Sequence, residues 1–197
     1  MTKVYTLKAL TDIWTGDPNR SGDRATTTGL LGSIRWRFEV LVRGLGGKAC
    51  DPTKHQCEGA RHSVLCELFG CTGWARKFRF ELLDGTGKVK ATQIKQNQTF
   101  TLRFLELRPI QPVEWALLDL TLCLIAEYGA VGGKTVLKPS DEANRANAAH
   151  HRDYGLIQIL KHPDDLKSLD RKQLGDYVQQ PRKPAHDDFD WASLQNL

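Results

Sequence analysis

Apolar and polar residues alternate in several short segments of this chain, and each such segment predicts a β-strand with one buried face. The clearest example places Phe78, Phe80 and Leu82 on the same side of one strand. Glycine, proline and aspartate residues, which are typical of turns, bound most of these segments. We expect strands at residues 3–10, 76–83, 88–95, 99–107 and 153–160, with 88–95 pairing back onto 76–83.

Longer segments have the pattern of helices. Residues 29–45 repeat apolar side chains at spacings of three and four, which predicts an amphipathic helix capped by Thr28 and ended by Gly46. Residues 113–128 are strongly apolar over a helical length and predict a largely buried helix. A more polar helix is expected at 164–178.

The order of these elements predicts the fold class. The order is strand, helix, three strands, helix and strand. This order fits an α+β fold of the ferredoxin-like or RRM-like type, with the helices on one face of the sheet. Residues 1–160 would form this domain, with a polar insertion at about 48–71. Residues 161–197 would be a polar C-terminal extension.

Charge and cysteine content narrow the class of protein. The formal net charge of +5 favours an anionic partner such as nucleic acid. No apolar run has the length of a membrane span, and the first residues lack the apolar centre of a signal peptide, so we expect a cytoplasmic protein with no membrane partner. In such a protein the cysteines clustered between Cys50 and Cys71 favour a metal over disulfides, whereas Cys123 is expected to lie in the core.

Three segments together resemble a known family. They are a Gly-Asp-Arg loop running into TTTGLLGSIRWRF, the turn Leu68-Phe69-Gly70, and the glycine loop at 129–134 followed later by Asp153-Tyr154-Gly155. In this order they are similar to the RAMP superfamily of CRISPR type III effector subunits, nearest to the branch of the first Cmr subunit of type III-B and related single-chain RAMP effectors. One departure is that the glycine loop reads GAVGGKTVLKP instead of ending in consecutive Gly, Arg and Phe.

The resemblance implies a zinc-binding insertion just ahead of the Leu-Phe-Gly turn. Structural zinc sites take four sulfur or nitrogen ligands, and the ion would order a segment too polar to order itself. The expected ligands are Cys50, Cys57, Cys66 and Cys71, with His62 as a substitute for the fourth.

The resemblance also implies that the chain binds guide crRNA through its first-helix region and glycine loop, and that its partners are target RNA and other type III subunits. Arginines bind phosphates bidentately, glycines admit phosphates close to the backbone, and aromatic rings stack on bases. The predicted RNA-binding residues are Arg20, Arg24, Gly32, Arg35, Trp36, Arg37, Arg43, Arg76, Lys77, Gly132, Gly133, Lys134 and Arg152.

Two alternative functions stay open. Backbone subunits of the family cut target RNA with a loop aspartate and a divalent metal, for which Asp17 and Asp23 would be the catalytic candidates here, with Mg²⁺ or another divalent ion. The first Cmr subunit is not the cleaving subunit, so we expect little activity from the chain alone. The other alternative is a structural module that contacts only protein.

Overall fold

One four-stranded antiparallel sheet organises the protein, in a computed structural model that describes residues 1–16, 24–50, 62–133 and 152–180. The strands lie in the order β2-β3-β1-β4, so the first strand sits inside the sheet. Tyr5 of the first strand pairs with Leu102 of the third in this register. The strands are β1 (Thr2–Ala9), β2 (Phe78–Asp84), β3 (Thr99–Glu106) and β4 (Ile157–Lys161).

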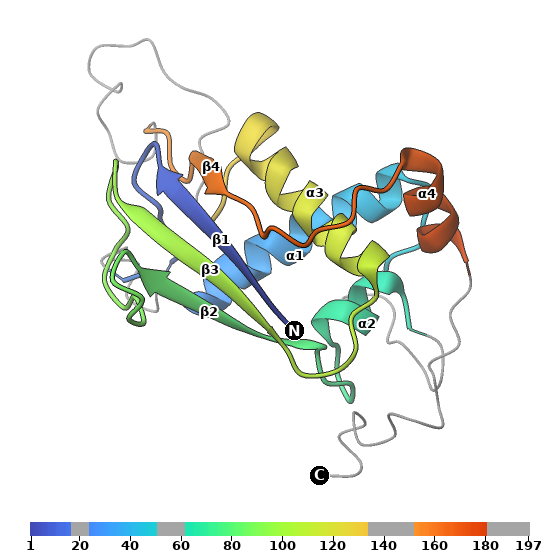
Figure 1. The fold of residues 1–197 in the computed structure, drawn as a ribbon. Helices are drawn as coiled ribbons and strands as arrows, with labels where there is room; N and C mark the ends of the chain where they lie inside the picture. The colour runs from blue at the N-terminus through green and yellow to red at the C-terminus, as the bar shows by residue number, and fades with distance from the viewer. Residues whose placement is uncertain (17–23, 51–61, 134–151, 181–197) are drawn as a thin grey trace.

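Helices cover one face of this sheet (Figure 1). The longest is α1, Thr27–Gly44, which ends where the backbone N–H groups of Gly46 and Gly47 bond back to its last turn. The others on this side are α2 (Val64–Phe69) and α3 (Pro112–Tyr128). The last helix, α4 (Arg171–Gln179), packs against α3 and the end of α1. The succession of strands and long helices, with the strand order above, is the predicted ferredoxin-like arrangement.

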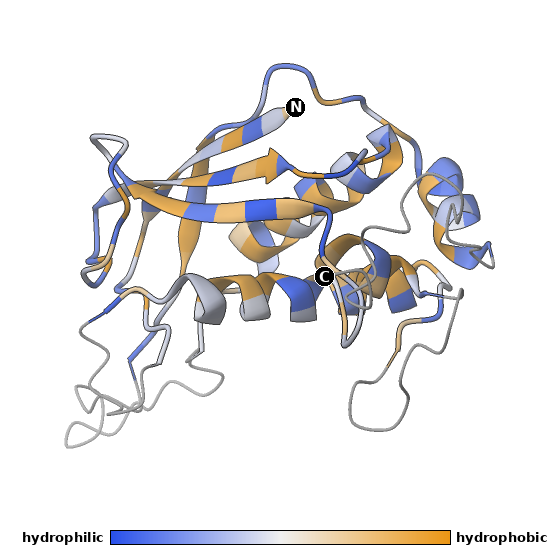
Figure 2. Cartoon of the chain, turned by 90° about the horizontal axis from the view of Figure 1, so that it is seen from below, coloured by the Kyte–Doolittle hydropathy of each residue, from blue (hydrophilic) through white to orange (hydrophobic). Residues whose placement is uncertain are grey.

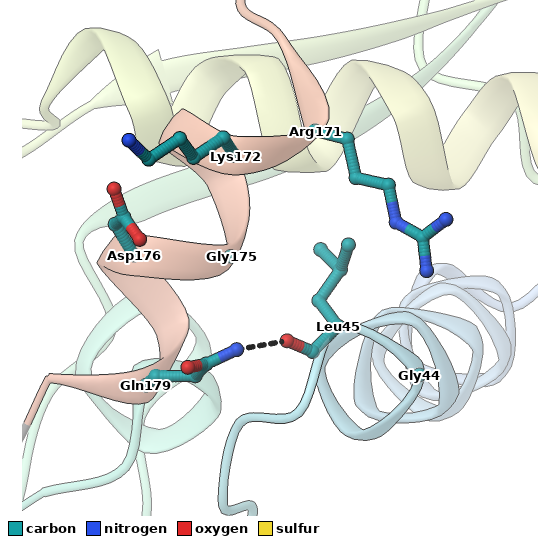
Figure 3. Close-up of a pocket in the computed structure, with 7 residues that line it drawn as sticks. All are labelled: Gly44, Leu45, Arg171, Lys172, Gly175, Asp176 and Gln179. Atoms are coloured by element: carbon teal, nitrogen blue, oxygen red, sulfur yellow. Dashed lines mark hydrogen bonds between the residues drawn. The ribbon is translucent and has the colours of Figure 1, made fainter.

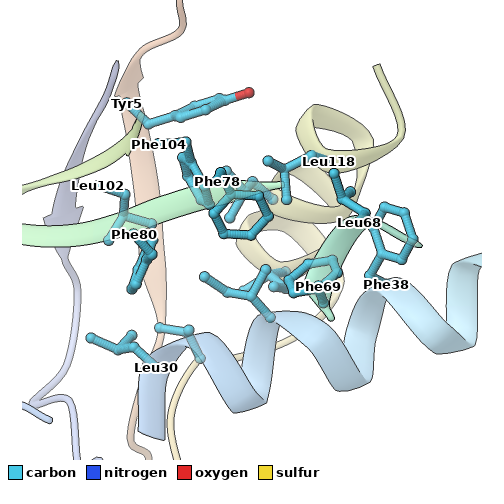
Figure 4. Packing of buried hydrophobic residues seen from close by; sticks show 14 of the residues in the cluster. Tyr5, Leu30, Phe38, Leu68, Phe69, Phe78, Phe80, Leu102, Phe104 and Leu118 are labelled. Atoms are coloured by element: carbon cyan, nitrogen blue, oxygen red, sulfur yellow. The ribbon is translucent and has the colours of Figure 1, made fainter. Parts of the chain in front are cut away.

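The core lies between the sheet and the helices. Phe38 of α1 meets Phe69 of α2 at 5.2 Å between ring centroids, and Phe69 in turn meets Phe78 of β2 at 5.4 Å (Figure 4). Hydrophobic residues are frequent in the strands and in the long helices, whereas polar residues gather in loops and in α4 (Figure 2). The alternation of buried and exposed residues along β1 and β3 therefore follows the sequence pattern.

Three expectations need correction. Residues 88–95 form no strand. The start of this segment pairs back onto the end of β2 as expected, where Val89 bridges Leu83 and the Lys90 N–H donates to the Leu82 carbonyl. The rest leaves β2: Thr92 bridges Arg24, and Ile94 bridges Ile13 and is fully buried. The end of the expected polar insertion and the first two residues of the Leu-Phe-Gly motif form the helix α2, which ends at Gly70 and whose apolar residues are buried. The last helix begins at Arg171 and not at 164.

No helix in the described ranges is long and apolar enough to cross a lipid bilayer.

Candidate nucleic-acid interface

The glycine loop at 129–133 folds against the start of α1 and the loop after β1. The Gly133 N–H donates to the Trp14 carbonyl at 2.8 Å, and the Gly132 N–H donates to the Ser33 hydroxyl at 3.0 Å. The glycine loop is thereby held beside two segments that lie about a hundred residues earlier in the chain. The sequence pattern placed both segments in the interface, but it did not identify Ser33 as the link.

A second connection fastens the same loop to the segment before β4. The Val131 N–H donates to the Gly155 carbonyl, and the Gly155 N–H donates to the Asp12 carbonyl, both at 2.9 Å. Gly132 and Gly155 have φ values of +111° and +76°. A Cβ at Gly132 would collide with the Trp14 carbonyl oxygen, so glycine is required there by both conformation and space.

Arginine and aromatic side chains border this junction. The Arg37 guanidinium lies 4.7 Å from the Trp36 ring centroid. It also lies close to Gly129: a Cβ added to that glycine would be 3.3 Å from the central carbon (Cζ) of the guanidinium. Trp36 is 56% exposed, and Tyr128, which the sequence interpretation did not select, is 80% exposed at the end of α3. A Cβ at Gly32 would meet no atom of the described residues within 4 Å, so the backbone there is open to a ligand.

Arg35 and Arg43, two predicted RNA-binding residues of α1, have intramolecular partners. Arg35 donates to the Gly70 carbonyl at 2.7 Å, which fastens α1 to the end of α2. Arg43 is hydrogen-bonded to Glu39 and to the Ala49 carbonyl. These contacts give Arg35 a role in holding α1 against α2, whereas the contacts of Arg43 lie at the surface.

The prediction that Lys77 binds RNA is corrected by its burial. Its ammonium group lies 2.9 Å from the carboxylate of the fully buried Glu114 and 3.3 Å from Glu67. Arg108 completes this cluster, 3.5 Å from Glu67. Burial lowers the pKa of the Arg108 guanidinium, and the nearby Glu67 and Glu114 carboxylates counter that effect.

Trp74 lies beside this cluster and is packed rather than presented for stacking. Its ring is stacked on the His62 ring, with 4.4 Å between the two centroids. The Arg108 guanidinium lies over the Trp74 ring, 5.1 Å from its centroid.

The residues of the predicted zinc insertion are partly placed. The Cys71 sulfur lies 3.7 Å from the His62 Nδ1, close to the separation of about 3.6 Å that two such ligands of one tetrahedral zinc would have. Cys66 is buried in the first turn of α2, and Cys50 is half-buried. Among the described residues these side chains form no group of three within 4.8 Å. Cys57 lies outside the described residues.

The other predicted residues divide by position. Arg24 makes a single bridge with Thr92 beside the loop after β1. Arg76 and Arg152 are exposed, the former next to the Leu-Phe-Gly turn. Asp17, Asp23, Arg20 and Lys134 lie outside the described residues.

Comparison with known proteins now identifies the family. The family model for the RAMP superfamily matches residues 6–137, so this chain belongs to the RAMP superfamily, as its motifs indicated. A search of curated proteins found no match.

The fold is shared with a solved structure. Apo Cmr1 from Pyrococcus furiosus aligns with a TM-score of 0.52 and 12% identity, covering 84% of this chain and 51% of Cmr1. This chain therefore spans about half the length of Cmr1. The Csm3–Csm4 subcomplex of a type III-A CRISPR-Cas interference complex aligns with a TM-score of 0.42 and 12% identity, over 90% of this chain and 93% of that chain.

Proposed function

We propose that this protein is an RNA-binding subunit of a CRISPR type III interference complex that holds the phosphate backbone of a guide RNA. The observation that carries the proposal is the junction where the glycine loop, the loop after β1 and the start of α1 meet. Membership of the RAMP superfamily supports it, as does the fold shared with Cmr1. Guide RNA, target RNA and other type III subunits are the partners of this proposal.

The side chains at the junction are suited to binding the sugar-phosphate backbone of RNA rather than to reading its base sequence. Arg37 can pair with a phosphate through two N–H groups while its other side stays on Trp36. Gly32 leaves room for a sugar-phosphate chain to approach α1 closely. Trp36 offers an exposed ring for stacking on any base. Contacts of this kind position RNA but leave the choice of sequence to base pairing with the guide.

The proposal includes a structural zinc ion ahead of the Leu-Phe-Gly turn. His62 and Cys71 would supply two ligands, in agreement with their 3.7 Å separation, and Cys50, Cys57 and Cys66 are the candidates for the others. The ion would hold the end of the insertion against Trp74, on which His62 is stacked.

Binding of a labelled guide-type RNA tests the function. Arg37→Ala and Trp36→Ala should each weaken RNA binding by the chain purified with its neighbouring subunits. In a plot of log affinity against log salt concentration, the slope for Arg37→Ala should be about one unit shallower, because one phosphate contact is removed. Unchanged RNA binding in both variants would refute the proposal and favour a module that contacts only protein.

Arg171→Ala provides a matched control. Arg171 is an exposed arginine of α4 beside Leu45, at the opposite end of α1 from the junction (Figure 3). Its removal lowers the net charge by the same amount but should leave the affinity for RNA nearly unchanged. Equal losses for Arg171→Ala and Arg37→Ala would indicate attraction by total charge alone.

A further inference from the structure

Three potential metal ligands converge on the side of the molecule where α3 meets the end of β4. Asp119 and Cys123 stand one turn apart on α3, and His162 directly follows β4. One ligand atom from each of them lies within 4.8 Å of the other two. Within the described ranges, this is the one group of three such side chains.

The packing of the fold brings these residues together. Residues four apart on a helix share a face, so Asp119 and Cys123 point the same way from α3. Antiparallel pairing of β4 with β1 carries the chain past Tyr5 and delivers His162 to that face, with the two rings 6.0 Å apart. The His162 Nδ1 is 2.8 Å from Asp119 Oδ1, and the Cys123 sulfur is 4.0 Å from Asp119 Oδ2.

The surroundings of the group leave it within reach of an ion. Cys123 is half-buried and does not lie in the core as expected. Asp119 and His162 remain partly exposed, so an ion could reach them from solvent.

We propose that Asp119, Cys123 and His162 bind one divalent transition-metal ion, with zinc as the best fit. A carboxylate oxygen, a thiolate sulfur and an imidazole nitrogen are all zinc ligands. The mixture of sulfur and nitrogen excludes Mg²⁺ and Ca²⁺, which take oxygen ligands. Three protein ligands leave a fourth tetrahedral position to water or to a group from a neighbouring subunit.

Binding has a defined proton balance. The Cys123 thiol must lose its proton to become a thiolate ligand, and His162 must bind as neutral imidazole. The hydrogen bond between Asp119 and His162 is replaced by two bonds to the same ion. The ion would thereby fasten α3 to the segment after β4. This site lies apart from the RNA junction and its existence does not depend on RNA binding.

Metal titration of the full chain tests the proposal. The chain, stripped of metal by a chelator and kept reduced, is titrated with Co²⁺ and then with Zn²⁺. Cys123→Ser and His162→Gln should each lower the zinc content by one ion per chain and remove a cobalt absorption component that contains a single thiolate. Unchanged zinc content and unchanged cobalt spectra in both variants would overturn the site.

Two further variants separate this ion from the others. Cys71→Ser removes a candidate ligand of the insertion and should leave the single-thiolate cobalt component in place. Glu127→Gln removes a nearby exposed carboxylate that is no ligand, and should weaken the affinity for zinc without changing the number of ions bound.

Because the His162 side chain is 44% exposed, His162→Gln should fold. Zinc should then raise the urea midpoint of the unsubstituted chain more than that of His162→Gln, and equal shifts would contradict the proposal.

Discussion

Arg35 of α1 donates a hydrogen bond of 2.7 Å to the carbonyl oxygen of Gly70, the residue that ends α2. This contact joins two motifs of the sequence, the Gly-Ser-Ile-Arg start of the first helix and the Leu-Phe-Gly turn. Burial of Ile34 and Phe38 sets the rotation of α1 about its own axis, and this bond agrees with it. With Arg35 directed at α2, Trp36 is left exposed and Arg37 reaches the glycine loop.

Arg35→Ala should therefore destabilise the fold, whereas Arg37→Ala should not. Loss of a hydrogen bond from a charged donor costs about 2 kcal/mol in the free energy of unfolding. Urea unfolding of the two variants, followed by circular dichroism, measures the difference. The assignment of roles would be wrong if Arg37→Ala lowered stability as much as Arg35→Ala did.

Gly132→Ala and Gly32→Ala should have opposite effects on stability. At Gly132 the positive φ and the Trp14 carbonyl oppose a side chain, and we expect a loss of about 1–3 kcal/mol. At Gly32, inside α1 and open to solvent, alanine should add up to about 1 kcal/mol through helix propensity.

Both glycine variants should nevertheless bind guide RNA less tightly, Gly132→Ala through distortion and Gly32→Ala through the added methyl group. Unfolding curves and RNA titrations on the same preparations check both effects. Tight RNA binding by Gly32→Ala would remove α1 from the proposed path of the RNA backbone.

Glu114→Gln should be among the more damaging single substitutions in the core. Glu114 is fully buried, accepts from Lys77, and caps α3 by accepting from the Gln111 N–H. Removing one partner of a buried ion pair costs about 3–5 kcal/mol, and Glu67 close to Lys77 should keep the loss near about 3 kcal/mol.

Glu39→Gln is the control for that substitution. Glu39 pairs with the half-exposed Arg43 on α1, and such surface pairs contribute less than about 1 kcal/mol. The urea midpoints of the two variants provide the comparison. Similar midpoints would mean that the buried pair contributes no more than the surface pair.

The pair between Lys3 and Asp165 should give stability an acid dependence. The hydrogen bond from the Lys3 ammonium lowers the pKa of the Asp165 carboxyl in the folded protein. A depressed folded pKa means that the stabilisation is complete above the ordinary aspartate pKa and is lost as the pH falls through the lowered value. Asp165→Asn should flatten the stability profile in that acid range.

Asp164→Asn is the neighbouring control for this pH profile. Asp164 is 85% exposed and pairs only loosely with Lys161, at 3.4 Å. Its substitution should leave the profile in place. Profiles altered equally by the two substitutions would show that the acid dependence comes from general charge and not from the Lys3 contact.

The sequence by itself determined the four paired strands, the two long helices and the family. Burial of one face forces a period of two on β1 and a period near 3.6 on α1, and both periods are legible in a single chain. The same local patterns led to the one error in the strands, at 88–95. There, pairing depended on where Ile94 could be buried rather than on alternation.

The tertiary structure alone decided what each functional side chain faces. Arg35 and Arg37 are the same residue type two positions apart, yet only the placement of α2 directs one to Gly70 and leaves the other beside Gly129. Lys77 is basic like the predicted RNA ligands, but Glu114 lies beneath it. Asp119 and His162 are 43 positions apart, and they meet only because α3 packs against β4, a relation that no local spacing encodes.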